Sequence, residues 1–109
     1  MTKPRSKSGA PHRLASRARE GAVRALERIE AAASFADIAL DHELASRPLS
    51  PRDAALAMEL VYGTLRWQRY LDWILAPHSR RPLETLDARV RVILRMAAYQ
   101  MALLDRVPA

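Results

Sequence analysis

The strongest constraint on the fold is a regular run of apolar residues between positions 56 and 74. The run consists of Leu56, Leu60, Gly63, Trp67, Leu71 and Ile74. Intervals of three and four residues place these side chains on one stripe of an α-helix, so they predict a helix with one buried face. A glycine inside a helix costs about 1 kcal/mol relative to alanine, so Gly63 predicts a close approach by a neighbouring backbone.

Signals at the ends of the apolar runs divide the chain into four predicted helices. They cover residues 13–33, 35–45 and 51–76, with the last running from about Asp87 to just before Val107. Ser50 followed by Pro51 gives the third helix the clearest start, and Ser34 offers a cap for the second. No alternating run of β-branched residues indicates a strand, so the chain predicts one all-α domain.

The net charge of +6 is concentrated at the N-terminus. The basic residues before the first acid, Glu20, are Lys3, Arg5, Lys7, Arg13, Arg17 and Arg19, and from Glu20 onward twelve basic residues balance twelve acidic ones. A phosphate at the start of the first helix would satisfy free N–H groups and the surplus charge together, which favours contact with nucleic acid. Two alternatives remain: a solvated, disordered tail over residues 1–12, and a basic transit peptide.

Composition argues against several other kinds of site. The chain has no cysteine, which excludes disulfides, thiolate metal sites and a cysteine nucleophile. His12, His42 and His78 lack the i, i+4 partner of helical zinc sites, so we predict no metal. No apolar run reaches the ~20 residues that a membrane span requires, so no membrane partner is expected.

Arginine and aromatic residues alternate in the third predicted helix. Arg66 and Arg69 adjoin Trp67 and Tyr70, a combination typical of surfaces that stack single-stranded RNA. Because Trp67 belongs to the apolar stripe, we predict that it is a structural core residue. Arg69 and Tyr70 face elsewhere and remain candidates, with Arg69 a candidate RNA contact.

The last predicted helix carries Arg91 and Arg95 four residues apart, where like charges repel. An acid of the third helix, either Asp72 or Glu59, would relieve this repulsion. We predict that Arg95 is a partly buried structural arginine paired with a carboxylate. The alternative is that Arg95 contacts phosphate.

Segments along most of the chain carry a family resemblance. They are Ala18 to Val23, Asp53 to Leu75, Val92 to Gln100 and Asp105 to Pro108. From about Arg17 to the last residue, the chain resembles the N-terminal domain of bacterial small-subunit ribosomal RNA cytosine methyltransferases of the RsmB family. That domain is similar to the transcription antitermination factor NusB.

The resemblance implies a NusB-like helical bundle in residues 13–109, preceded by the tail at residues 1–12. It implies RNA contacts from the arginine-rich first helix, here Arg13, Arg17 and Arg19, with Arg24 a further candidate on the same helix. The family continues beyond Pro108 into another helix, which implies a partial domain truncated at its C-terminal end.

These observations predict an RNA-binding accessory domain that positions ribosomal RNA for a catalytic domain absent from this chain. The implied parent is a cytoplasmic enzyme that uses S-adenosylmethionine and a nucleophilic cysteine. We expect no catalytic residue and no cofactor in this chain, because it has no cysteine and only three scattered glycines. The alternatives are a module that docks on the parent's catalytic domain or on a ribosomal protein, and a stand-alone antitermination factor.

Overall fold

The structure is a computed structural model that describes the backbone of residues 3–104 and the side chains of residues 17–104. Its α-helices are α1 (Lys3–Ala32), α2 (Ala36–Ser46), α3 (Pro51–Arg66), α4 (Gln68–Leu75) and α5 (Ala88–Tyr99). Short helical turns are η1 (Ala76–His78), η2 (Leu83–Thr85) and the π-helical η3 (Gln100–Leu104). Residues 3–104 contain no strand, which confirms the all-α prediction.

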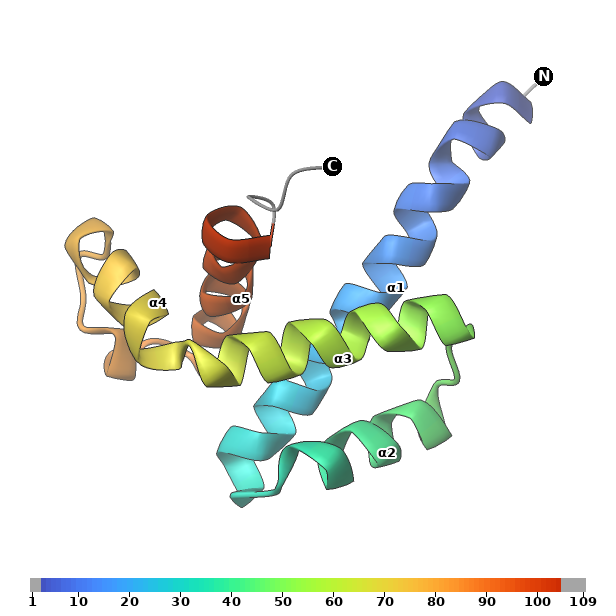
Figure 1. The fold of residues 1–109 in the computed structure, drawn as a ribbon. Coiled ribbons are helices and arrows are strands. Elements are labelled where there is room, and N and C mark those ends of the chain that lie inside the picture. Colours follow the sequence, from blue (N-terminus) through green and yellow to red (C-terminus); the bar gives the residue numbers. More distant parts are fainter. Residues whose placement is uncertain (1–2, 105–109) are drawn as a thin grey trace.

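Helix α1 is the element around which the bundle forms. It packs against α2, α3 and α5, while α4 packs against α5 (Figure 1). Ala18, Ala22 and Ala25 of α1 are fully buried, and their small side chains allow the neighbouring helices to approach closely. The larger residues of the core are Val23, Leu26, Leu40, Leu60, Val61, Leu71, Val92, Met96 and Tyr99. The N-terminal half of α1 extends beyond the other helices (Figure 1).

The start of α1 differs from the prediction. The helix begins at Lys3 rather than Arg13, so helical backbone covers most of the segment 1–12 that was expected to be disordered. Pro4 lies in the first turn, where its missing N–H costs little, and Pro11 removes one internal hydrogen bond without ending the helix. Arg13 therefore lies inside the helix, and the phosphate site predicted at a helix start beside it is wrong.

The third predicted helix is divided into two. Its start is confirmed, because the Ser50 hydroxyl accepts a hydrogen bond from the backbone N–H of Asp53 at 3.2 Å. At Trp67 the backbone leaves the helical region, with φ −103° and ψ 17°. This break turns the Trp67 side chain off the stripe, and 43% of the residue is exposed, so its predicted place in the core is wrong. Leu71, the next residue of the stripe, is fully buried.

One predicted packing face and one predicted helix cap are also wrong. The apolar spacing of the last predicted helix favours inward positions for Val90, Ile93 and Met101. Val90 and Ile93 of α5 and Met101 of η3 are instead exposed, because the face that carries Val92 and Met96 packs. At the start of α2, the Ser34 hydroxyl provides no cap, since Phe35 is the N-cap residue and no side chain caps it.

Gly63 is explained by one side chain. The ring of Tyr99 occupies the space that a Cβ atom at Gly63 would need. The close approach predicted for this glycine therefore exists, but it comes from a side chain of α5 rather than from a backbone.

The end of α1 predicts a stabilising substitution. Ala33 has a φ of 51°, a left-handed conformation that costs an L-residue roughly 1 to 2 kcal/mol and glycine much less. We expect Ala33→Gly to raise the free energy of unfolding by about 1 kcal/mol. The control Ala31→Gly, inside the helix, should lower it by about the same amount. Urea titrations that show both variants shifting in one direction would contradict this explanation.

Candidate nucleic-acid interface

The arginines of α1 occupy different environments. Arg17 and Arg19 are exposed. The Arg19 Nε atom donates a hydrogen bond to Oε1 of Gln100 at 2.8 Å, and Arg17 has no ion-pair partner among the residues that the structure describes. The Arg13 side chain lies outside the described residues. Arg17 and Arg19 are therefore the predicted contacts whose positions on the surface can be stated.

Arg24 serves the junction between α1 and α2. Its Nε atom contacts Oε2 of Glu43 at 2.6 Å, and the Glu43 side chain is only 3% exposed. Arg47, four residues along α2, lies 3.6 Å from the same carboxylate. Withdrawing Arg24 to bind phosphate would leave a buried carboxylate poorly paired, so this geometry favours a structural role over the predicted RNA contact.

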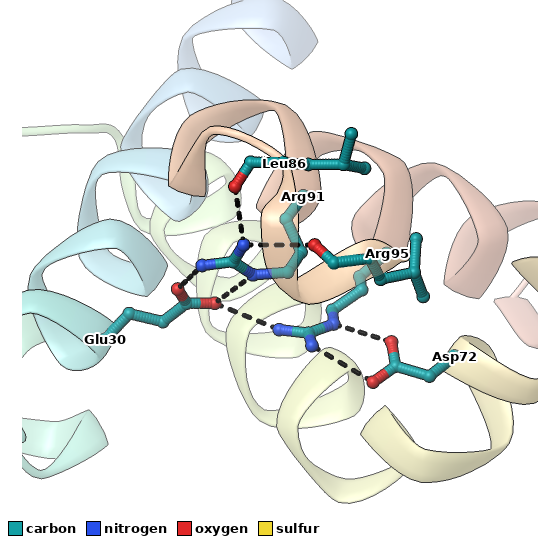
Figure 2. Close-up of polar contacts among 6 residues, drawn as sticks. Glu30, Asp72, Leu86, Arg91 and Arg95 are labelled. Carbon is teal, nitrogen blue, oxygen red and sulfur yellow. Dashed lines mark hydrogen bonds and ion pairs between the residues drawn. The ribbon is translucent and has the colours of Figure 1, made fainter. Parts of the chain in front are cut away.

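Arg95 lies at the centre of an ion-pair network that joins α1, α4 and α5. It donates two hydrogen bonds to the Asp72 carboxylate, from Nε at 2.7 Å and from Nη2 at 3.0 Å. Its Nη1 atom donates a third to Oε2 of Glu30 at 2.9 Å (Figure 2). The predicted pairing of Arg95 with Asp72 is confirmed, and Glu30 is a partner that the sequence did not reveal.

Arg91 completes the network. It donates to the Glu30 carboxylate at 2.6 Å, and its Nη1 atom donates to the backbone oxygens of Leu86 at 2.7 Å and Leu83 at 3.2 Å (Figure 2). The hydrogen bond that Arg91 donates to the Glu30 carboxylate raises the pKa of Arg91 above its ordinary value. Glu30 thus lies between the two like charges of α5 and removes their repulsion.

The second acid considered for Arg95 has a different partner. Oε2 of Glu59 accepts a hydrogen bond from the Tyr99 hydroxyl at 2.5 Å. Burial, together with this hydrogen bond, raises the pKa of Tyr99 to about 12. Tyr99 therefore ties α5 to α3 both through Glu59 and through its ring against Gly63.

A row of aromatic side chains lies on the surface of α4 and the break before it. The rings of Trp67 and Tyr70 meet edge to face with centroids 6.0 Å apart, and those of Tyr70 and Trp73 stack with centroids 6.1 Å apart. Arg69, the predicted RNA contact of this segment, is exposed and lines a shallow pocket with Tyr70. The sequence prediction omitted Trp73, although its spacing of three residues from Tyr70 was a visible signal.

The described residues contain neither a glycine-rich loop nor a cluster of metal-binding side chains. All three glycines lie within helices, so they form no glycine-rich loop for S-adenosylmethionine. Among residues 17–104, whose side chains the structure describes, no cluster of three histidine, aspartate or glutamate side chains could hold a metal ion. In the same part of the chain, no helix combines the length and apolar character needed to cross a membrane.

The network predicts a large loss of stability when Arg95 is removed. Arg95→Met leaves Asp72 without its partner, and a partly buried carboxylate left unpaired costs about 2 to 3 kcal/mol. Adding Asp72→Leu should recover much of this loss, because no unpaired charge then remains beside α5. Chemical denaturation of both variants measures the difference, and a double variant no more stable than Arg95→Met would exclude this explanation.

The raised pKa of Tyr99 predicts a loss of stability at high pH. An unfolded tyrosine loses its proton near pH 10, whereas native Tyr99 keeps its proton up to about pH 12. The native state holds the extra proton between these values, so the free energy of unfolding should fall as the pH rises from 10 to 12. Tyr99→Phe should lack this step and the exposed control Tyr70→Phe should retain it. Equal slopes in both variants would contradict the assignment.

Comparisons with known proteins place the chain in a family. Residues 16–109 match the NusB family. The chain is 39% identical to the probable ribosomal RNA small subunit methyltransferase B of Synechocystis over 84% of its own length and 21% of the relative. It is 48% identical to the corresponding protein of Thermus thermophilus. This match covers 60% of this chain and 16% of the Thermus protein. No solved structure matches.

A second kind of relative covers almost the whole chain. The transcription antitermination protein NusB of Xylella fastidiosa is 31% identical over 97% of this chain and 68% of its own length. By contrast, the chain spans about a fifth of the first methyltransferase relatives that it matches. The match over residues 16–109, the all-α bundle and the similarity to a full-length antitermination protein together show that this chain belongs to the NusB family.

Proposed function

We propose that this chain is an RNA-binding accessory domain of a small-subunit ribosomal RNA cytosine methyltransferase. In this role it positions the RNA for a catalytic domain that lies in other sequence. The chemistry, including any use of S-adenosylmethionine, belongs to that catalytic domain, and the helical bundle contributes binding energy and orientation.

The charge distribution is the observation that carries this proposal. All six surplus positive charges precede Glu20 in the sequence, and from Lys3 onward they belong to α1. The first turn of α1 contains no acidic residue, and the exposed Arg17 and Arg19 continue the basic segment toward the bundle. A basic helix extending from a neutral bundle suits contact with phosphates, because each neutralised phosphate releases counterions irrespective of base sequence.

The relatives support the methyltransferase context in particular. Probable or established small-subunit ribosomal RNA methyltransferases from Synechocystis, Bacillus subtilis and Thermus thermophilus all match this chain over about a fifth or less of their length. This pattern is expected for one domain of a larger enzyme.

A stand-alone antitermination factor is the second candidate. The NusB protein of Xylella fastidiosa matches nearly all of this chain and two thirds of itself, which favours this role. Docking on the catalytic domain or on a ribosomal protein is compatible with either candidate. The exposed apolar residues Val90 and Ile93 of α5 and Met101 of η3 offer a surface for it.

The charge proposal predicts a specific salt dependence. Binding of a small-subunit ribosomal RNA transcript should weaken linearly on a log–log plot against salt concentration. Replacing Arg17 and Arg19 by alanine should reduce the magnitude of that slope by about 1.4 to 1.8, since each lost phosphate contact removes about 0.7 to 0.9. Adding Arg13→Ala should reduce it further.

The matched control removes two positive charges elsewhere. Arg80 and Arg81 are exposed residues of the loop between η1 and η2, and their double alanine variant has the same net charge as the α1 variant. We expect this control to keep nearly the wild-type slope. Equal slopes for the two double variants would show that net charge alone, rather than α1, determines binding, and failure of the wild-type chain to bind RNA would refute the proposal.

A further inference from the structure

The exposed face of α4 and the break before it carry three aromatic side chains in a row. Trp67, Tyr70 and Trp73 follow one another at intervals of three residues, which places them on one side of the helix. They are 43%, 42% and 72% exposed. Leu71, on another side of the same helix, is fully buried, so α4 packs through Leu71 and the row is a surface feature.

Positive charge accompanies the row. Arg66 and Arg69 are both exposed, and neither has an ion-pair partner within 4.0 Å among the described side chains. Asp72, the acid of the same helix, is held by Arg95. Arg66 and Arg69 line a pocket of about 500 Å³ together with aromatic residues of the row. This arrangement favours an anionic ligand.

An open cleft adjoins the row at Trp67. It has a volume of about 610 Å³ and is lined in part by Tyr62, Arg66, Trp67 and Tyr99. The acid in the cleft, Glu59, accepts the hydrogen bond from Tyr99 described above. The cleft and the shallow pocket share Arg66 and Trp67 in their linings, so the two hollows adjoin each other at Trp67.

We propose that Trp67, Tyr70 and Trp73 bind unpaired bases of single-stranded RNA while Arg66 and Arg69 contact its phosphates. Aromatic faces stack on any base, and arginines beside them hold the backbone, so this composition suits a single strand. The stacked rings of Tyr70 and Trp73 are too close to admit a base between them, because two contacts of about 3.5 Å would need about 7 Å. The bases therefore stack on the outer faces of the row.

This inference rests on the proposed RNA-binding function and adds a second surface to it. In Figure 1, α5 lies between α4 and the N-terminal half of α1. The two surfaces differ in chemistry, since α1 offers charge to any phosphate backbone, whereas the row recognises unstacked bases. Single-stranded RNA should use both surfaces and duplex RNA only the first.

The two tryptophans of the chain are both in the row, so intrinsic fluorescence reports directly on this surface. The probe is octauridylate, with an RNA duplex of equal phosphate count as the comparison. We expect octauridylate to quench the tryptophan emission and the duplex to leave it nearly unchanged, even where titration of labelled RNA shows that the duplex binds.

The variant test pairs two equally exposed aromatic residues. Trp73→Ala should weaken octauridylate binding by about tenfold, within the range expected for the loss of one stacked base, and Trp73→Phe should restore most of it. Phe35→Ala, which removes a 74% exposed ring at the start of α2, should have no effect. Duplex affinity and the salt slope should be the same in the wild type and all three variants.

Failure of this inference is distinguishable from failure of the proposed function. If the wild type binds RNA and Trp73→Ala binds octauridylate as tightly, the aromatic surface is not an RNA site, while the role of α1 stands. If Trp73→Ala instead abolishes self-association without changing RNA affinity, the row is a protein interface and the inference is overturned. If the wild type binds neither RNA, both proposals fall.

Discussion

The guanidinium of Arg95 is the interaction on which the arrangement of this bundle depends. Its three hydrogen bonds reach Asp72 of α4 and Glu30 of α1, and through Glu30 it is linked to Arg91 and the loop before α5. Without these contacts α4 would keep only its apolar side to hold it against α5. The network is more exposed than a closed core, so its main effect is to fix the orientation of α4 and α5 against α1. Other packings of these helices would leave charges unpaired.

That orientation determines which side chains remain available for binding. Arg24, which the sequence grouped with the other α1 arginines, is withdrawn into the junction with α2 by Glu43. Arg17 and Arg19 remain on the surface of α1, next to the basic segment that precedes them. The Asp72 carboxylate of α4 is paired with Arg95. Arg66, at the end of α3, and Arg69 of α4 therefore remain as the charges beside the aromatic row. The same ion pairs that stabilise the fold therefore concentrate uncompensated positive charge on two separate surfaces.

Local signals in the sequence predicted the helices well, and long-range contacts explain most of the errors. The cap at Ser50, the burial of Leu60 and Leu71 and the Arg95–Asp72 pair follow from spacing and elementary electrostatics. The break at Trp67 could not be predicted, because no proline or second glycine marks it. Glu30 lies 65 residues from Arg95, and no periodicity reveals such a partner. The sequence identified the basic residues of α1 as candidates but could not show which of them stay free, because the pairing of Arg24 with the buried Glu43 depends on how α1 packs against α2.

The central claim is that RNA is held by α1 and by the aromatic face of α4. Photo-crosslinking this chain to a single-stranded ribosomal RNA segment, with the crosslinked peptides identified by mass spectrometry, tests this claim most directly. The account predicts crosslinked peptides from the basic part of α1 through Arg19 and from the segment spanning Trp67 to Trp73. Crosslinks confined to α2 or to the exposed apolar face of α5 would contradict it.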